Sequence, residues 1–423
     1  MTAAAVLVHP TDSGPGPTVR VRSGPRLLAG VEDGPGLDRH RDRVGALCTP
    51  RLARLLRSLD ALDIRGRGGA GFPFATKLRA TAGARGRPTV VVNLSEGEPA
   101  SFKDAALAAT RPHQVLDGAS LTACALGSRE VHLVLPGEHP AVRHSIRTAL
   151  AERRGEDRRV RWRLHTADPR FVAGQARAVV ELLSGRPNLP VTGWQPEAVC
   201  GYRGRPTLLS NAETFAQVAA AVALGEDGYA RLGTDDEPGS LLLTVAGDGS
   251  RPEVVEAAHG TAWSAVLPAG VLVRPVLLGG YHGTWAAPGA LTGRTVSRPG
   301  LAEAGLALGA GVVLPLADGE CPLTRTSGIV GYLAGQSAQR CGPCLNGLPA
   351  LAAAVRATAL GRPATDRMTQ LAGLVERRGA CAHPDGTVRL VRSLLAAYPD
   401  EVTAHADGCC TFGASLPGEE IAS

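Results

Sequence analysis

The most constraining feature of this chain is a glycine-rich segment at residues 65–77, RGRGGAGFPFATK, in which four glycines stand among two arginines and a lysine. Gly66, Gly68 and Gly71 have the spacing G-x-G-x-x-G. Glycine lets the backbone turn tightly and bring its N–H groups close to a phosphate. The segment therefore predicts a phosphate-binding loop, and for the spacing alone a flexible turn between two helices is the alternative.

A second polar segment, NLSEGEPASFKD at residues 93–104, directly follows the apolar run Thr89 to Val92. The run predicts a short buried strand. Ligands of doubly wound sheets bind at the carboxyl ends of the strands, where Asn93, Glu96 and Glu98 would emerge. The alternative for these carboxylates is a solvated loop.

Taken together, these two segments resemble the NADH-oxidising F subunit, which carries FMN in the NADH dehydrogenase of bacterial and mitochondrial complex I. Relatives of this subunit occur in NAD-linked hydrogenases and formate dehydrogenases. The resemblance is to motifs in order, from about Ala53 to the C-terminus. It implies an α/β Rossmann-like flavin domain, a small ubiquitin-like β-grasp (SLBB) domain and a C-terminal helical bundle that binds iron and sulfur.

The resemblance also implies site residues. Glu96 and Glu98 are the expected catalytic residues, and FMN and NAD(H) are the expected cofactor and donor. The expected cofactor-binding residues are Arg65, Gly66, Arg67, Gly68, Gly69, Gly71, Lys77, Asn93, Ser95, Glu96, Ser210, Asn211 and Thr214.

Two departures from the family pattern fall in this predicted site. The family has two consecutive asparagines where this chain has Ser210 and Asn211, and a serine hydroxyl can still hydrogen-bond a flavin. Asn211 followed by Thr214 also fits a helix start, which is the structural alternative. The family has two acidic residues where this chain has Gln175 and Ala176, so we expect NADH to bind weakly or to be replaced by another donor.

The order of predicted elements gives the domain boundaries. We expect an irregular N-terminal extension at residues 1–50 and an FMN-binding domain of alternating strands and helices at 51–236. Short β-rich runs separated by Gly and Pro predict the β-grasp domain at 237–322. Helical segments return in the predicted iron–sulfur domain at 323–423.

Three cysteines near the C-terminus have metal-ligand spacing. Cys341 and Cys344 form a C-x-x-C motif, and Cys381 follows 37 residues later. The family ligates a [4Fe–4S] cluster with three closely spaced cysteines and one distant cysteine, and Ala338 stands at the position of the first. A zinc site and a C-x-x-C redox pair are the alternatives.

The missing ligand has several candidate replacements. Cys409, Cys410 and His383 are the candidates, and we expect Cys410 because a tail cysteine keeps all-thiolate ligation. Pairing a flavin with an iron–sulfur cluster converts two-electron into one-electron transfer. The predicted function is therefore a flavin-dependent oxidoreductase, and the alternative is a non-enzymatic scaffold subunit whose nicotinamide site has decayed.

Charge and composition argue against several other classes of protein. A net charge of +6 in 423 residues, with no Lys/Arg run, argues against a nucleic-acid-binding protein. The first ten residues lack a basic leader, and the longest uncharged stretch, 275–293, is interrupted by glycines and prolines, so we expect no signal peptide and no transmembrane segment. We expect a cytoplasmic protein that passes electrons to a ferredoxin or a reductase subunit and reaches a membrane only through that partner.

Overall fold

The structure is a computed structural model, and it describes residues 4–8, 18–137, 139–157, 159–193, 195–247 and 249–413. The chain divides into two compact units. The first unit comprises Met1–Val245, Arg251–Thr261 and Thr295–Ser297. The second comprises Ala246–Ser250, Ala262–Arg294 and Arg298–Ser423.

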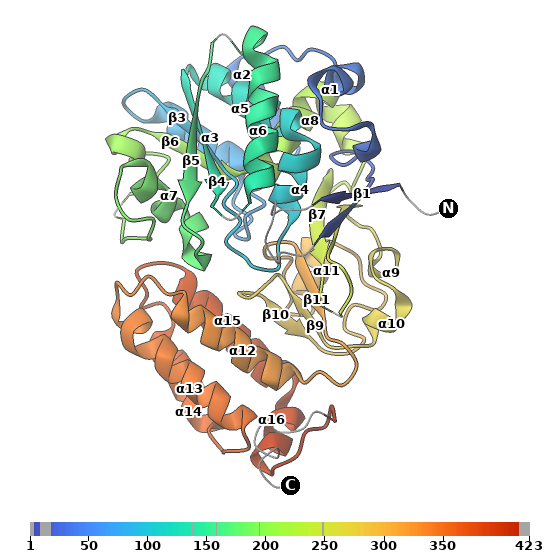
Figure 1. The fold of residues 1–423 in the computed structure, drawn as a ribbon, viewed down its shortest axis with the longest axis vertical. Coiled ribbons are helices and arrows are strands. Elements are labelled where there is room, and N and C mark those ends of the chain that lie inside the picture. Colours follow the sequence, from blue (N-terminus) through green and yellow to red (C-terminus); the bar gives the residue numbers. More distant parts are fainter. Residues whose placement is uncertain are drawn as a thin grey trace. The chain divides into compact units, whose positions relative to one another are not determined.

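A four-stranded parallel sheet forms the centre of the first unit (Figure 1). Its strands are β3 (Thr89–Asn93), β4 (Glu130–Pro136), β5 (Arg161–Ala167) and β6 (Thr207–Asn211), in the spatial order β5-β4-β3-β6. All three pairings are parallel. The predicted α/β class with a parallel sheet is confirmed.

Both faces of this sheet are covered, which explains the continuous apolar run in β3. Val90 and Val92 point into the main core, whereas Val91 points to the opposite face and packs in a smaller cluster with Leu209 and Tyr202. Because successive side chains of a strand alternate between faces, a two-sided sheet needs apolar residues at every position of a central strand.

Helices surround the sheet in the first unit. They are α2 (Leu52–Ala61), α3 (Phe74–Gly83), α4 (Lys103–Thr110), α5 (Pro112–Leu126), α6 (Pro140–Glu152), α7 (Ala176–Leu183) and α8 (Ala212–Ala230). In α2 leucines recur every three or four residues, and Leu55 and Leu59 are buried in the core. Apolar residues at helical spacing therefore fixed which face of α2 is buried.

The sequence predicted an irregular N-terminal extension at residues 1–50, but parts of this segment form strands and a helix. Ala5–Val8 forms β1, Val19–Arg22 forms β2 and Leu37–Val44 forms helix α1. β2 pairs in parallel with β8 (Glu253–Ala258), which in turn pairs antiparallel with β7 (Ser240–Val245). β2 pairs antiparallel with the nearby β1, but its other partner, β8, lies more than 200 residues away in the chain, so the sequence alone did not reveal that β2 belongs to a larger sheet.

The second unit contains three antiparallel strands and the C-terminal helices. In the strand order, β9 (Val276–Leu278) lies between β10 (Thr284–Ala286) and β11 (Val312–Pro315), and these strands belong to a seven-stranded sheet. The short helices α9 (Trp263–Val266), α10 (Ala269–Leu272) and α11 (Arg298–Ala302) lie in the same region of the chain. The longer helices are α12 (Pro322–Gly335), α13 (Leu348–Ala359), α14 (Thr365–Val375), α15 (His383–Ala397) and α16 (Pro399–Ala406).

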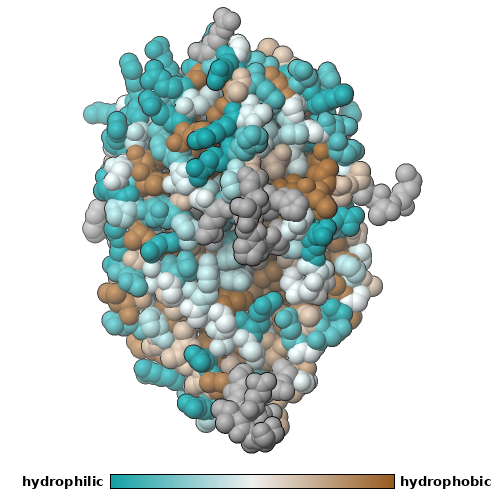
Figure 2. All heavy atoms as spheres, in the orientation of Figure 1, coloured by the Kyte–Doolittle hydropathy of each residue, from teal (hydrophilic) through white to brown (hydrophobic). Residues whose placement is uncertain are grey.

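The surface is mixed in character. Figure 2 shows hydrophilic residues interspersed with small hydrophobic patches on the face that it draws, which is ordinary for a folded protein. Among the described residues, none of the helices combines the length and the hydropathy that a membrane crossing requires.

Candidate functional site

The glycine-rich segment forms a closed loop between α2 and α3. Gly66 N donates a hydrogen bond to Phe72 O at 2.9 Å, which ties the two ends of the loop together. Gly69 and Gly71 have positive φ values of 102° and 60°, and only glycine adopts these conformations without the steric cost of a Cβ atom. The spacing of glycines therefore serves a tight turn.

The space in front of this turn suits an anionic ligand. No heavy atom lies within 4 Å of the position that a Cβ would take at Gly68 or at Gly71. Any larger residue there would fill space that a phosphate group needs to reach the backbone N–H groups. The loop thus fits the phosphate of a cofactor.

The cations of the loop have definite partners. Arg65 Nε donates to Asp63 Oδ2 at 2.6 Å, and Arg67 Nη2 donates to Ser240 O at 3.1 Å. Both guanidinium groups therefore contact neighbouring protein groups. Lys77 Nζ donates to Leu209 O at 3.1 Å, so this ammonium group lies beside the last residues of β6.

The backbone of Arg67 connects the loop to the sheet. Arg67 N lies 3.2 Å from Asn211 Oδ1 and 3.0 Å from Thr214 Oγ1. Asn211 occupies the position before α8, but its side chain makes no capping hydrogen bond to that helix. Thr214 Oγ1 donates to Asn211 Oδ1 instead. The predicted helix start is present, because α8 begins directly after Asn211, but the Asn211 side chain contacts the glycine loop and does not cap the helix.

Asn93 and Ser210 complete the carboxyl edge of the sheet. Asn93 is the register partner of Asn211, since β3 and β6 run side by side. Asn93 Nδ2 donates to Gly174 O at 2.8 Å, and Ser95 Oγ donates to Asn93 Oδ1 at 2.6 Å. Ser95, Ser210 and Asn211 are all buried. These side chains form a polar edge beside the glycine loop, as the carboxyl ends of parallel strands do in ligand-binding sheets.

A buried charge cluster lies beneath this edge. Lys103 Nζ lies 3.2 Å from Asp104 Oδ1 and 3.1 Å from Glu213 Oε2, and Asn211 Nδ2 donates to Asp104 Oδ2 at 3.2 Å. Although burial opposes the charge, the surrounding carboxylates raise the pKa of Lys103. Burial raises the pKa of Glu213. Sequence reasoning did not single out Lys103 or Glu213, and the adjacent Lys-Asp pair at the start of an apolar helix was the available signal.

Glu96 has an unusual backbone and a structural role. Its φ is +24°, a sparsely populated region that costs about 1–3 kcal/mol for a non-glycine residue. Glu96 Oε2 accepts a hydrogen bond from Ala105 N at 3.0 Å at the start of α4. Burial, followed by the nearby charge of Asp104, raises the pKa of Glu96. Glu98 Oε1 accepts a hydrogen bond from Ala100 N at 3.4 Å.

Gln175 and Ala176, which stand where the family has two acidic residues, lie next to the polar edge of the sheet. Gln175 is the residue before α7, and Ala176 is the first residue of that helix. Gly174, which accepts the hydrogen bond from Asn93, precedes them directly. Groups at these positions thus lie where they can influence a ligand at the sheet edge.

The structure brings together three of the predicted metal ligands. Cys341 precedes the turn Pro343–Gly347 that leads into α13, and Cys381 lies just before α15. Burial, a hydrogen bond with Cys341 and the charges of Cys341 and Cys381 raise the pKa of the Cys344 thiol to about 11. The hydrogen bond places the Cys341 and Cys344 thiols side by side, and Cys381 is near enough to act on Cys344, an arrangement that fits the thiolate ligands of a metal cluster.

Cys410 does not belong to this group. Its Sγ donates to Glu401 Oε1 at 3.1 Å, and Cys321 Sγ donates to the same oxygen. Cys321 directly precedes α12, whereas Cys341 follows the other end of that helix. A helix of 14 residues is about 21 Å long. The prediction that Cys410 is the fourth cluster ligand is therefore corrected, because the tail folds toward the opposite end of α12.

Two protein-family models match separate parts of the chain. Residues 59–220 match the model of the Nuo51 FMN-binding domain. Residues 326–405 match the model of the NADH-ubiquinone oxidoreductase-F iron-sulfur binding region. The first range contains the glycine loop and both strand ends, and the second contains Cys341, Cys344 and Cys381.

Similar proteins carry related names. The chain is 27% identical over 401 residues to the F subunit numbered 2 of the NADH-quinone oxidoreductase of Rhizobium meliloti (strain 1021), covering 90% of this chain and 94% of that protein. It is 33% identical over 218 residues to the alpha subunit of the NAD-reducing hydrogenase HoxS of Cupriavidus necator, covering 48% of this chain and 36% of that subunit.

A solved structure also matches the fold. A chain in the crystal structure of an NAD⁺-reducing [NiFe]-hydrogenase in the air-oxidized state superposes with a TM-score of 0.81 and 27% identity, covering 91% of this chain and 67% of that chain. The chain therefore belongs to the family of electron-transfer oxidoreductase subunits that contains the F subunit of NADH-quinone oxidoreductase and the alpha subunit of NAD-reducing hydrogenase, with an FMN-binding domain followed by a [4Fe–4S]-binding region.

Proposed function

We propose that the glycine loop holds the phosphate of FMN and that the flavin ring lies over the carboxyl ends of β3 and β6. The observation that carries this assignment is the contact of Arg67 N with Asn211 Oδ1 and Thr214 Oγ1. It fixes the loop against the polar edge of the sheet, so that one ligand can reach both. The proposed binding residues are Arg65, Gly66, Arg67, Gly68, Gly69, Gly71, Lys77, Asn93, Ser95, Glu96, Ser210, Asn211 and Thr214.

The proposed roles follow from the chemistry of each group. Backbone N–H groups of the loop and the ammonium of Lys77 neutralise the phosphate. Asn93 and Asn211 supply amide groups that hydrogen-bond the ring edge. Glu98, at the start of the loop that follows β3, orients the nicotinamide donor, and the buried ammonium of Lys103 supplies a fixed positive charge beneath the site.

Bound FMN accepts two electrons as a hydride and releases them singly, and a [4Fe–4S] cluster carries one electron at a time. In the second unit we assign the cluster to Cys341, Cys344 and Cys381. Ala338 supplies no ligand atom, so three thiolates hold the cluster. The protein's part is to position these groups and to exclude water from them.

We further infer the domain order and setting. The proposed domains are an N-terminal extension at 1–50, the FMN domain at 51–236, a β-grasp (SLBB-like) domain at 237–322 and a helical iron–sulfur domain at 323–423. NADH is the proposed donor, bound weakly because Gln175 and Ala176 replace acidic residues. A cytoplasmic ferredoxin or reductase subunit is the proposed acceptor, and association with a membrane occurs through that partner.

The test is the cofactor content of anaerobically purified protein. We expect about one FMN per chain, released on denaturation, and iron and sulfide in equal amounts. Cys381→Ser should remove the iron and leave the flavin, whereas Cys124→Ser, on α5 in the first unit, should change neither. Protein without flavin and without iron would favour the alternative of a scaffold subunit, for which Gln175, Ala176 and Ala338 are the supporting departures.

A further inference from the structure

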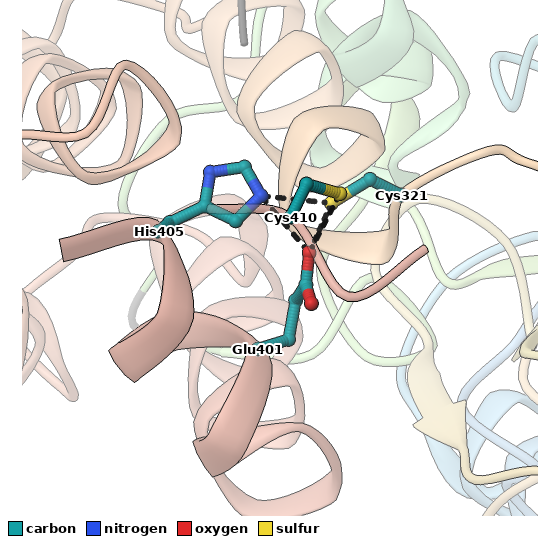
Figure 3. Close-up of side chains that lie close together, drawn as sticks. All are labelled: Cys321, Glu401, His405 and Cys410. Carbon is teal, nitrogen blue, oxygen red and sulfur yellow. Dashed lines mark hydrogen bonds and ion pairs between the residues drawn. The ribbon is translucent and has the colours of Figure 1, made fainter. Parts of the chain in front are cut away.

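A second group of metal-ligand side chains lies in the second unit, apart from the three cluster cysteines. Figure 3 shows Cys321, Glu401, His405 and Cys410 pointing toward one another. Their ligand atoms all lie within 4.8 Å of one another. Cys321 directly precedes α12, Glu401 and His405 lie one turn apart on α16, and Cys410 comes from the segment after α16.

The distances between the ligand atoms of this group suit a small metal ion with tetrahedral coordination. Glu401 Oε1 lies 3.1 Å from Cys321 Sγ, 3.1 Å from Cys410 Sγ and 2.9 Å from His405 Nε2. Cys321 Sγ lies 3.4 Å from His405 Nε2. Zinc bonds of about 2.0–2.3 Å to oxygen, nitrogen and sulfur place tetrahedral ligands about 3.3–3.8 Å apart. Shifts of a few tenths of an ångström in the side chains would therefore admit the ion.

The hydrogen-bond inventory of His405 also calls for a cation. His405 Nδ1 lies 3.1 Å from Ala359 O, and a carbonyl oxygen accepts only, so Nδ1 carries the proton. In the neutral ring Nε2 is then an acceptor. It faces Glu401 Oε1, which is an acceptor as well. Two lone pairs held this close need a proton or a metal ion between them, and a bound metal ion would meet this need.

Neighbouring groups hold these ligands in place. Thr411 N donates to Glu401 Oε2 at 2.9 Å, which leaves Oε1 directed at the two sulfur atoms. Thr324 N lies 3.5 Å from Cys321 Sγ at the start of α12, and a helix N-terminus stabilises a thiolate. The carbonyl of Ala359 fixes the ring of His405 in the way that outer-shell partners fix metal-bound histidines.

The site is also enclosed. Cys321, Glu401 and His405 are 3%, 2% and 0% exposed, and Cys410 is partly buried. Metal binding would deprotonate the two thiols, and the ion would then compensate the buried negative charge of the thiolates and of Glu401. All four ligand positions come from the chain, so no position is left for a substrate, and this is typical of structural zinc sites.

We propose that Cys321, Glu401, His405 and Cys410 bind one Zn²⁺ ion that fastens the C-terminal segment and α16 to the start of α12. Two sulfur ligands, one imidazole and one carboxylate in a compact tetrahedral set favour Zn²⁺ over Mg²⁺ or Ca²⁺, which prefer oxygen ligands. This site goes beyond the proposed electron transfer, because Zn²⁺ has no redox chemistry. It also gives Cys410 a metal-binding role with partners other than the cluster cysteines.

The test measures zinc and iron separately in the full chain purified anaerobically without chelator. The wild-type protein should contain about one zinc per chain. Cys410→Ser and His405→Gln should each lower the zinc content at least tenfold and leave the iron content unchanged. Cys409→Ser is the matched control, since Cys409 is the exposed neighbour of Cys410, and it should retain zinc. Cys381→Ser should lose iron and retain zinc, so failure of the cluster assignment and failure of the zinc assignment are distinguishable.

A second measurement covers variants that fold poorly. Cobalt added to metal-free wild-type protein should produce the visible bands of tetrahedral, thiolate-bound Co²⁺, and Cys410→Ser should weaken these bands while its circular dichroism spectrum stays the same. Wild-type protein that takes up neither zinc nor cobalt would overturn the proposal. A disulfide between Cys321 and Cys410 in anaerobic protein, or zinc retained in both Cys410→Ser and His405→Gln, would overturn it as well.

Discussion

Asn93 and Asn211 are register partners at the carboxyl ends of β3 and β6, yet their amide groups are held by different parts of the chain. Asn93 Nδ2 donates to Gly174 O at 2.8 Å, whereas Asn211 Nδ2 donates to Asp104 Oδ2 at 3.2 Å. The two side chains thereby bring the segment before α7 and the start of α4 to one edge of the sheet. The proposed binding of a single extended cofactor at this edge depends on this convergence.

Gly68→Val should remove flavin from the protein without disturbing the fold. A Cβ at this position meets no protein atom within 4 Å, so the added side chain would collide only with a phosphate in the loop. We expect FMN affinity to fall at least tenfold, which corresponds to about 1.4 kcal/mol or more. Flavin released on denaturation is the measurement.

Gly83→Val is the matched control for this variant. Gly83 also has no heavy atom within 4 Å of its Cβ position, and it lies at the end of α3, outside the loop. Full flavin occupancy in both variants would mean that the phosphate lies elsewhere.

The double variant Gln175→Glu, Ala176→Glu should reduce the KM for NADH. These positions lie beside Gly174 at the edge of the sheet, and carboxylates there would accept hydrogen bonds from the hydroxyl groups of the dinucleotide. One such bond to a charged group contributes about 1.5–3 kcal/mol, so we expect at least a tenfold change. Stopped-flow bleaching of the flavin by NADH reports it.

Gln370→Glu serves as the control for the donor experiment, because it makes the same chemical change at an exposed position on α14. If the Gln370→Glu variant and the double variant responded equally to NADH, the lack of acidic residues at 175 and 176 would not be the cause of weak NADH binding. Rapid bleaching of the flavin in the wild-type protein by micromolar NADH would also show that acidic residues at these positions are not needed.

Lys103→Met should destabilise the protein strongly. Lys103 is 3% exposed, and its loss removes the cation from Asp104 and leaves Glu213 with only the more distant Arg67. Removing one partner of a buried ion pair costs about 3–5 kcal/mol. Urea unfolding followed by circular dichroism measures the change.

The exposed ion pair of Arg79 and Asp60 serves as the control for the buried ion pairs of Lys103. Arg79→Met should cost at most about 1 kcal/mol, as surface ion pairs do. If Lys103→Met unfolded at the same urea concentration as Arg79→Met, the buried cluster would not be a source of stability.

Stability should fall between pH 6.5 and about 4 because of His132. Burial, followed by the charge of His165, lowers the pKa of His132 from 6.5 to about 4. The folded protein then binds fewer protons than the unfolded chain, so this contribution is present above pH 6.5 and is lost as the pH falls toward 4. At about 1.4 kcal/mol per pKa unit the loss is at most about 3.5 kcal/mol.

His132→Gln should reduce this pH dependence of the free energy of unfolding, and the remaining dependence comes from other histidines with lowered pKa values, such as His113 and His282. His144→Gln on α6 changes an exposed histidine and should leave the dependence as it is in the wild type. A wild-type slope that survives in His132→Gln would assign the effect to other groups.

Local sequence patterns determined much of this protein. The apolar run at residues 89–92 predicted β3, and the glycine-rich segment predicted the tight loop that contains Gly69 and Gly71. Hydrophobic periodicity and glycine chemistry act within a few residues, so the sequence reports them directly. The order of motifs then identified the family, because the glycine loop, the polar edge and the C-x-x-C motif follow one another as they do in its members.

Only the tertiary structure decided which distant groups meet. The pairing of β2 with β8, the bond from Arg67 N to Asn211 and the ion pair of Lys103 with Glu213 each join segments that are more than 100 residues apart. The sequence offered Cys410 as a ligand for the cluster, yet the direction of α12 and α16 places it beside Cys321 and His405. The rigid length of a helix fixes which of its two ends a tail can reach, and no count of cysteines contains that information.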